Sequence, residues 1–218
     1  MTYKSIAIDG PAGAGKSTVA KALAKKLNFN YLDTGAMYRV YTYYYLSNNI
    51  NIEDEKLVEN HIKNIDMKIV DGEFYLNGKN VNKEIRDSQV TLNVSLVSSY
   101  KSVRENLVKK QRQISKNSNI ILDGRDIGTH VLTNADIKFF LTATAEIRAQ
   151  RRYDESDKGK MSYEDVLKDI KRRDLYDSSR TISPLRQAED AILIDSSEMN
   201  VEEVVETMYR YIEEKNVI

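Results

Sequence analysis

A glycine-rich segment near the amino terminus has the residue types and spacing of a phosphate-binding loop. The segment Gly10-Pro11-Ala12-Gly13-Ala14-Gly15-Lys16-Ser17 fits the pattern G-x-x-x-x-G-K-[S/T] throughout. Glycines let successive backbone N–H groups turn toward a polyphosphate, and the amino terminus of a following helix adds partial positive charge. Lys16 can reach the β and γ oxygens of a nucleoside triphosphate, and the Ser17 hydroxyl can bind Mg²⁺. The segment therefore predicts a nucleoside triphosphate site.

The surroundings of this phosphate loop (residues 10–17) agree with that prediction. An apolar strand at 5–8 precedes it, and a helix with an apolar stripe that includes Val19, Leu23 and Leu27 follows it. A chance glycine-rich turn would need neither element. A dinucleotide-binding fingerprint is the other alternative, but Thr18 stands where its third glycine is required. We reject that alternative.

A phosphate loop predicts a ligand and leaves the reaction open among three classes of protein. These are a small-molecule kinase, a GTP-dependent switch, and a motor or transporter ATPase. The sequence lacks the Asn-Lys-x-Asp pattern that would recognise guanine and the Leu-Ser-Gly-Gly signature of transporters, and 218 residues are few for a motor. These absences favour the kinase.

The distribution of arginine also favours phosphate chemistry. Seven of the thirteen arginines lie between residues 148 and 186. Arginine binds phosphate in a bidentate manner and stays charged, and a transferring phosphoryl group needs its charge neutralised away from water. The alternative is a solvated helix face on which arginine pairs with Asp and Glu. For the cluster as a whole we favour a phosphate-binding segment that closes over the nucleotide.

The pattern of apolar residues predicts an α/β protein. Continuous apolar runs predict buried parallel strands, and apolar stripes at helical spacing predict helices between them. The strands are predicted at 5–8, 30–32, 119–122, 137–141 and 191–194, and the helices at about 19–27, 36–46, 99–115, 145–152, 162–173 and 201–212.

A different pattern occupies residues 65–81. Three short candidate strands at 67–70, 73–76 and 80–81 are separated by Asp-Gly and Asn-Gly dipeptides, which favour tight hairpin turns. We expect a small antiparallel meander that needs the main body for stability. The polar stretch at 153–161 predicts a mobile loop. One domain over 1–218 follows, with an inserted subdomain at about 62–96 and a lid at about 148–162.

Composition limits the range of partners. Lys plus Arg and Asp plus Glu both number 33, which argues against a nucleic-acid binder, and no apolar stretch is long enough to span a bilayer. The chain has no cysteine, which fits a reducing compartment such as the cytoplasm. We expect a cytoplasmic monomer that binds small molecules and neither nucleic acid nor membrane.

Three further segments carry a resemblance to a known family. They are Leu32-Asp33-Thr34-Gly35-Ala36-Met37-Tyr38-Arg39, Leu122-Asp123-Gly124-Arg125-Asp126-Ile127-Gly128-Thr129, and Ile170-Lys171-Arg172-Arg173-Asp174. With Asp177–Arg180 and the Ser183-Pro184-Leu185 that follows, they resemble bacterial cytidylate kinases, members of the nucleoside monophosphate kinase family of P-loop kinases. The resemblance spans almost the whole chain, and the meander resembles the insert of the longer bacterial form. An adenylate kinase would have Asp in place of Ala36.

The resemblance implies a three-layer P-loop fold with a mobile lid, and roles for particular residues. ATP would bind at residues 10–18, from Gly10 to Thr18, with Mg²⁺ held by Ser17 and, through water, Asp123. The residues implied in transfer are Lys16, Arg125, Arg148 and Arg152. The residues implied in binding CMP are Thr34, Arg39, Ser95, Arg104, Arg125, Asp126, Arg173, Asp177 and Arg180. Thr34 stands where the family usually has Ser, so its hydroxyl is kept beside an added methyl group.

The choice of cytosine follows from donor and acceptor chemistry. Cytosine has an amino donor at N4 and acceptors at N3 and O2, whereas uracil has the opposite pattern at N3 and position 4. A carboxylate accepts from the amino group while arginine donates to N3 or O2. Asp126 with Arg104 or Arg180 would supply this pair. The alternative for Asp126 is a helix cap or a structural ion pair with Arg125 or a neighbour.

The expected reaction transfers the γ-phosphoryl group of ATP to CMP or dCMP and gives CDP or dCDP. Two alternatives remain open. One is a kinase for another small acceptor, such as UMP, dTMP or a hydroxy acid. The other is a regulatory module that binds nucleotide without catalysing transfer.

Overall fold

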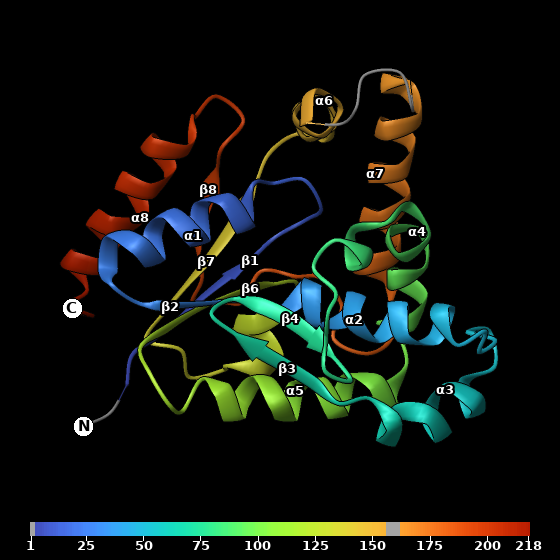
Figure 1. The fold of residues 1–218 in the computed structure, drawn as a ribbon. Helices are drawn as coiled ribbons and strands as arrows, with labels where there is room; N and C mark the ends of the chain where they lie inside the picture. The colour runs from blue at the N-terminus through green and yellow to red at the C-terminus, as the bar shows by residue number, and fades with distance from the viewer. Residues whose placement is uncertain (1–2, 156–161) are drawn as a thin grey trace. The chain divides into compact units, whose positions relative to one another are not determined.

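The computed structural model describes residues 3–155 and 162–218, which form two compact units (Figure 1). The sheet unit consists of residues 3–32 and 115–218, and the helical unit consists of residues 33–114. Each unit is described by itself below. The boundaries expected from the sequence, about 62–96 for an insert and 148–162 for a lid, stay predictions.

A five-stranded sheet forms the centre of the sheet unit. Its strands are β1 (Ser5–Asp9), β2 (Asn30–Asp33), β6 (Ile120–Gly124), β7 (Ile137–Thr142) and β8 (Ile192–Asp195), in the order β2-β6-β1-β7-β8. Strand β1 is parallel to both β6 and β7, and β7 is parallel to β8. The α/β fold with a central parallel sheet is therefore confirmed.

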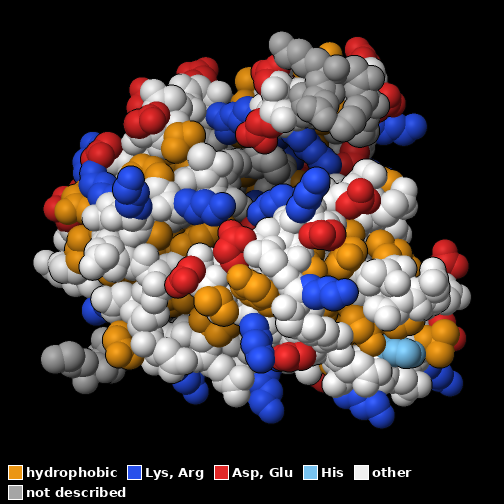
Figure 2. Space-filling view, viewed as in Figure 1, with side chains coloured by type: hydrophobic (Ala, Val, Ile, Leu, Met, Phe, Trp, Pro, Cys, Tyr) orange, Lys and Arg blue, Asp and Glu red, His pale blue; other side chains and the backbone are white. Residues whose placement is uncertain are grey.

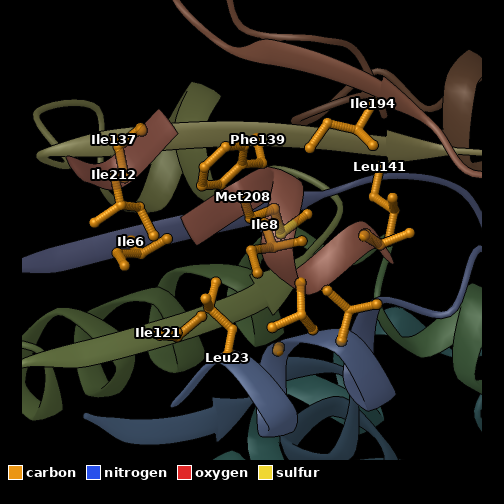
Figure 3. Packing of buried hydrophobic residues seen from close by; sticks show 14 of the residues in the cluster. Ile6, Ile8, Leu23, Ile121, Ile137, Phe139, Leu141, Ile194, Met208 and Ile212 are labelled. Atoms are coloured by element: carbon orange, nitrogen blue, oxygen red, sulfur yellow. The ribbon is translucent and has the colours of Figure 1, made fainter. Parts of the chain in front are cut away.

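The core of the sheet unit packs α1 (Lys16–Leu27) and α8 (Val201–Glu214) against this sheet (Figure 1). Ile8, Leu23, Phe139 and Met208 belong to one cluster of buried side chains, and Figure 3 shows them pointing toward one another. The apolar stripes of both helices supply this cluster, as their spacing predicts. Asn200 begins α8 with a reciprocal capping box that includes Glu203.

The parallel topology gathers several loops at the carboxyl edge of the sheet. In the strand register Asp9 lies opposite Gly124 on β6 and Phe140 on β7. The segments that follow β1 and β6 therefore begin at the same edge. Ligands of open α/β sheets bind in this region, beyond the carboxyl ends of the strands.

Two helices, α6 (Ala145–Glu155) and α7 (Tyr163–Ser179), pack against each other through Ala149, Val166 and Ile170. The predicted lid covers part of this pair: residues 148–155 are helical, and 156–161 lie outside the described residues. Helix α7 extends six residues past its predicted end at 173. The apolar stripe stops at Ile170, but the buried face continues with the charged residues Arg173 and Asp177.

The helical unit holds the predicted meander, with β3 (Met67–Val70), β4 (Glu73–Leu76) and β5 (Lys79–Asn80) antiparallel. Asp71 and Gly72 both have positive φ, as do Asn77 and Gly78, so both dipeptides form the expected kind of turn. Strand β5 lies one residue earlier than predicted. Strand β4 packs on α2 (Thr34–Ser47), as expected for a meander too small to stand alone.

Helices complete this unit. They are α2, α3 (Glu55–His61), α4 (Ser88–Val97) and α5 (Lys101–Ile114), with the short 3₁₀ turns η1 (Ile62–Asn64) and η2 (Glu84–Arg86). Sequence patterns missed α3 and α4. Helix α4 contains three Val and one Thr, residue types that favour strands, but Asp87 accepts from the N–H of Gln89 and begins the helix. The tyrosines of α2 serve packing: Tyr41 and Tyr45 are fully buried.

The charges on the surface agree with the balanced composition. Figure 2 shows Lys and Arg side chains scattered among Asp and Glu over the visible face. In the ranges 3–155 and 162–218, no helix is both long and apolar enough to cross a membrane.

Candidate active site

The phosphate loop connects β1 to α1 in a conformation that requires glycine. Gly10, Gly13 and Gly15 have φ values of 152°, 77° and 82°, which disfavour residues with a Cβ. A Cβ on Gly10 would lie 1.9 Å from the carbonyl oxygen of Leu141, so the loop also passes too close to β7 for any side chain. Gly15 is the N-cap of α1 and has no side chain to cover the helix terminus. The first N–H groups of α1 are thus suited to an anion.

Lys16 lies within this loop. Its Nζ donates to the carbonyl oxygen of Pro11 at 2.7 Å, and the residue is 6% exposed. Burial lowers the pKa of Lys16 to about 7, and the nearby charge of Arg125 acts in the same direction, against the opposing effects of Asp123 and Asp9. An anion beside Nζ would favour the charged form of this amine.

A hydroxyl and a carboxylate meet beside the loop. Ser17 Oγ donates to Asp123 Oδ2 at 2.8 Å, and the hydroxyl of Tyr31 donates to Asp123 Oδ1 at 2.9 Å. Asp123 stands near the end of β6 and is 4% exposed. The structure therefore brings together the two residues that the sequence assigns to Mg²⁺, and adds Tyr31 as a partner that the sequence analysis missed.

Two ion pairs join the segment after β6 to the α7 region. Arg125 Nε donates to Asp177 Oδ2 at 2.8 Å, and Arg180 NH2 lies 3.5 Å from Asp126 Oδ1. Burial alone would raise the pKa of Asp177, but the charges of Arg125, Arg180 and Arg173 outweigh burial and lower it. The alternative for Asp126 is an ion pair with Arg125 or a neighbour. The structure instead pairs Asp126 with Arg180, a predicted acceptor-binding residue, and pairs Arg125 with Asp177.

Arg148 supports the phosphate loop. Its guanidinium donates to the carbonyl oxygens of Ala12, at 2.9 Å, and of Ala143, at 2.8 Å. It also forms a bidentate pair with Asp174 of α7, at 3.0 and 2.7 Å. With only 5% of Arg148 exposed, these contacts tie the loop to α7. A direct contact of Arg148 with a transferring phosphoryl group stays a prediction.

The other predicted lid arginine has different surroundings. Arg152 NH1 donates to Asp169 Oδ2 at 2.9 Å, and Arg172 NH2 donates to Asp169 Oδ1 at 2.7 Å. The side chain of Arg152 is 31% exposed, so it is more accessible than Arg148. Its role in transfer also stays a prediction.

The helical unit positions the other four predicted acceptor-binding residues. Thr34 is buried in the first turn of α2, which Asp33 caps. Arg39 NH1 donates to Thr91 Oγ1 at 2.8 Å, which links α2 to α4. Ser95 is buried on α4, the helix that α2 packs against.

Arg104 is the most buried arginine of the helical unit, at 2% exposure. Its NH1 donates to the carbonyl oxygen of Ser98 at 3.1 Å, and its guanidinium lies 5.6 Å from the centre of the Tyr38 ring. The sequence marks Arg104 only through the family resemblance, because its neighbours on α5 form an ordinary apolar stripe.

The sequence analysis missed several acidic or hydroxyl partners of the sheet-unit residues, among them Asp9, Asp174 and Tyr31. Asp9 accepts from backbone N–H groups after Asp126, Asp174 holds Arg148, and Tyr31 donates to Asp123. Asp9 directly precedes the phosphate loop, and this position is the one local signal for its importance. The other two pairings depend on how distant segments pack.

A phosphate loop at the carboxyl edge of a parallel sheet, with buried arginine–carboxylate pairs beside it, defines a P-loop kinase of small molecules. The sequence model described as "Cytidylate kinase" matches residues 6–214. The chain therefore belongs to the cytidylate kinase family.

Individual relatives agree along almost their whole length. The chain is 52% identical over 210 residues to the cytidylate kinase of Fusobacterium nucleatum, covering 95% of this chain and 96% of that protein. It is 45% identical over 218 residues to the cytidylate kinase of Bacillus subtilis, covering 97% of each.

Solved structures of other kinases share the fold. A gluconokinase from Sinorhizobium meliloti matches with a TM-score of 0.52 and 12% identity, covering 97% of this chain and 94% of that one. A shikimate kinase from Bacteroides thetaiotaomicron matches with a TM-score of 0.50 and 15% identity, covering 96% and 98%. At these identities the likeness supports the P-loop kinase fold alone.

Replacing Lys16 tests its role in the phosphate loop. We expect Lys16→Met to lower turnover at least about a hundredfold, because a buried cation facing transferred charge is lost. The melting temperature should change little, because burial already disfavours the charged amine. Steady-state ADP release and thermal unfolding measure both quantities. Lys25→Met, an exposed change in the last turn of α1, should alter neither. Retained turnover or marked unfolding of Lys16→Met would contradict this role.

The ion pair of Asp177 predicts a pH dependence of stability. The pKa of Asp177 in the folded state lies below its ordinary 3.8, so the ionised carboxylate stabilises the fold at pH values above 3.8. This stabilisation is lost as the pH falls through the folded-state pKa. We expect Asp177→Asn to lower the free energy of unfolding by about 1–3 kcal/mol at pH 7. Denaturant titrations should show a smaller difference at pH 3.

The exposed Asp154 provides the matched control for removing one negative charge. Asp154→Asn should change the free energy of unfolding by less than about 0.5 kcal/mol. A difference for Asp177→Asn that grows toward pH 3 would show that the pair does not stabilise the fold.

Proposed function

We propose that this protein transfers the γ-phosphoryl group of ATP to CMP and dCMP. The observation that carries the proposal is the family match over residues 6–214, which includes the phosphate loop and every predicted acceptor-binding residue. A neutral composition without cysteine also leads us to propose a cytoplasmic monomer.

The phosphate loop is proposed to bind the triphosphate of ATP. Residues 10–18 offer backbone N–H groups and the amino terminus of α1 to phosphate oxygens. Lys16, already folded into the loop, would exchange its contact with the carbonyl of Pro11 for a phosphate oxygen. The phosphate would favour the charged form of the buried Lys16 amine, whose pKa is lowered in its absence. The new hydrogen bond would therefore be charge-assisted.

Ser17 and Asp123 are proposed to hold Mg²⁺ with ATP, Asp123 through water. The fit rests on donor chemistry, because Mg²⁺ prefers oxygen ligands and commonly keeps several waters, and these two side chains place a hydroxyl beside a carboxylate. When bound, the ion neutralises charge that develops on the phosphate oxygens. Tyr31 would orient the Asp123 carboxylate through its hydrogen bond.

The acceptor is proposed to bind the residues that the family resemblance implies. Arg39 and Arg125 would hold the monophosphate, with Arg173 near the phosphate and the sugar, and the Thr34 hydroxyl would also serve in binding. Asp177 would accept from a ribose hydroxyl. The pyrimidine and the sugar would be surrounded by Ser95, Arg104, Asp126 and Arg180.

Asp126 is proposed to distinguish cytosine from uracil. Asp126 is 4% exposed, so an acceptor group of the base placed against its carboxylate would remain unpaired. The N4 amino group of cytosine donates to such a carboxylate, whereas O4 of uracil cannot. Arg180 NH2 lies 3.5 Å from Asp126 Oδ1 and places a positive charge beside this carboxylate.

Catalysis is proposed to rest on positioning and electrostatics. The two anionic substrates need alignment and charge neutralisation more than a proton-transferring base. Lys16 and Arg125 would supply positive charge, with Arg148 and Arg152 as further candidates. Closure of the lid region at about 148–162 would exclude water and limit hydrolysis of ATP.

A panel of acceptors tests the proposed function. ADP release from ATP is measured with CMP, dCMP, UMP, dTMP, AMP and shikimate, and we expect CMP and dCMP to give the highest kcat/KM. Equal turnover of UMP would overturn the base assignment. Nucleotide binding without faster ADP release on addition of CMP would favour a regulatory module instead.

Changing Asp126 tests the reading of the base. Asp126→Asn presents an amide that can also donate to O4 of uracil, so we expect the CMP-to-UMP ratio of kcat/KM to fall at least about tenfold. The KM for ATP should change less. Asp195→Asn removes an exposed carboxylate from the end of β8 and should leave the ratio unchanged. An unchanged ratio for Asp126→Asn would assign Asp126 to structural support.

A further inference from the structure

Asp9 is a buried carboxylate that the proposed function does not use. It is the last residue of β1, directly before Gly10, and is 4% exposed. Its Oδ1 accepts from the N–H of Ile127 at 2.8 Å, and its Oδ2 accepts from the N–H of Gly128 at 2.7 Å. One side chain therefore joins the start of the phosphate loop to the two residues that follow Asp126.

The segment that Asp9 holds has an unusual backbone. Residues Ile127–Val131 form a single π-helical turn, η3, and Asp126 has φ −146° and ψ 27°. The carbonyl oxygen of Asp126 accepts from the N–H groups of His130 and Val131, at 2.9 and 3.1 Å. Turns of this kind are rare and often occur at functional sites. The first N–H groups of such a turn need acceptors, and Asp9 supplies two.

A second contact fixes the far end of the same segment. Lys138 on β7 donates from Nζ to the carbonyl oxygen of Thr133 at 2.7 Å. The stem of Lys138 also lies beside Gly128, where an added Cβ would be 3.0 Å from Lys138 Cδ and 3.5 Å from Asp9 Oδ2. Residues 126–133 are thus held at both ends, with close packing at Gly128.

The location of Asp9 is unfavourable for a carboxylate. Burial raises the pKa of Asp9 to about 6, and the two N–H donors only partly oppose this effect. Asp126 lies near enough for its charge to raise the pKa further. A carboxylate needed only to cap a turn would have a smaller desolvation cost at an exposed position. The buried geometry therefore indicates a more specific role.

We propose that Asp9 is a positioning residue that sets the backbone at Asp126, and thereby aims the Asp126 carboxylate at the acceptor base. The proposal rests on the proposed function, because it gives Asp126 the role of reading cytosine. It adds that the residue before the phosphate loop controls acceptor recognition. Asp9 itself touches neither substrate in this arrangement.

The alternative is a purely structural role, in which Asp9 stabilises the fold without affecting recognition. The chain contains a matched control for that role. Asp136 also accepts a backbone N–H, that of Ser5 at 2.8 Å, but at the opposite end of β1. Removing either carboxylate removes a side-chain-to-backbone hydrogen bond that involves β1. Of the two carboxylates, only Asp9 contacts the residues that directly follow Asp126.

The experiment compares Asp9→Asn, Asp9→Ala and Asp136→Asn with the wild type, using ATP with CMP or UMP. We expect Asp9→Ala to raise the KM for CMP by about tenfold and to lower the CMP-to-UMP ratio of kcat/KM, because two contacts to the turn are lost. Asp9→Asn should show a smaller change, because its one carbonyl oxygen keeps one of the two contacts. The KM for ATP should change less in both.

The outcomes separate this proposal from the function on which it rests. A wild type that does not phosphorylate CMP would overturn both. In the other case the wild type phosphorylates CMP, and the Asp9 variants lose stability as Asp136→Asn does but keep the CMP-to-UMP ratio. That result would overturn only the role of Asp9. If Asp9→Ala does not fold, the nearly isosteric Asp9→Asn decides. Faster hydrogen exchange at Ile127 and Gly128 in Asp9→Asn would support the proposal independently of activity.

Discussion

The cationic side chains that would bind phosphate must be neutralised, by burial or by carboxylates, before a phosphate binds. This electrostatic constraint governs the candidate site. Lys16 avoids repulsion by burial, which favours its neutral form. The arginines are balanced by carboxylates: Arg125 by Asp177, Arg180 by Asp126, and Arg148 by Asp174. Each pair holds a cation in place, and two of these carboxylates, Asp126 and Asp177, are themselves proposed to contact the acceptor.

This balance explains why α7 is long and why its buried face changes character. Val166 and Ile170 pack on α6, whereas Arg173 and Asp177, further along the same face, take part in the charge network. The helix is therefore a packing element in its first half and an electrostatic element in its second. Sequence periodicity detects only the first half, since charged residues at buried positions look like a solvated surface.

Local patterns were sufficient for the phosphate loop, the parallel strands and the two hairpin turns. Each depends on a few adjacent residues, such as the glycines of the loop or Asp71-Gly72. The contacts of Asp9 join residues 118 and 119 positions apart, and the pair of Arg148 with Asp174 joins two helices. No pattern within one segment reports such contacts. Helix α4 was missed for a different reason, because its β-branched residues favour strands and its packing overrides that preference.

The contacts of Arg148 bear on how this enzyme could be re-engineered. Because one guanidinium joins Ala12 of the phosphate loop to Asp174 of α7, the loop and that helix are mechanically linked. A chimera that takes α7 from a distant kinase without an acid at position 174 would leave the buried guanidinium of Arg148 without this carboxylate partner. The loop would then lose its link to α7. Grafts that exchange α7 should therefore keep an acid at position 174 or carry the phosphate loop with the helix.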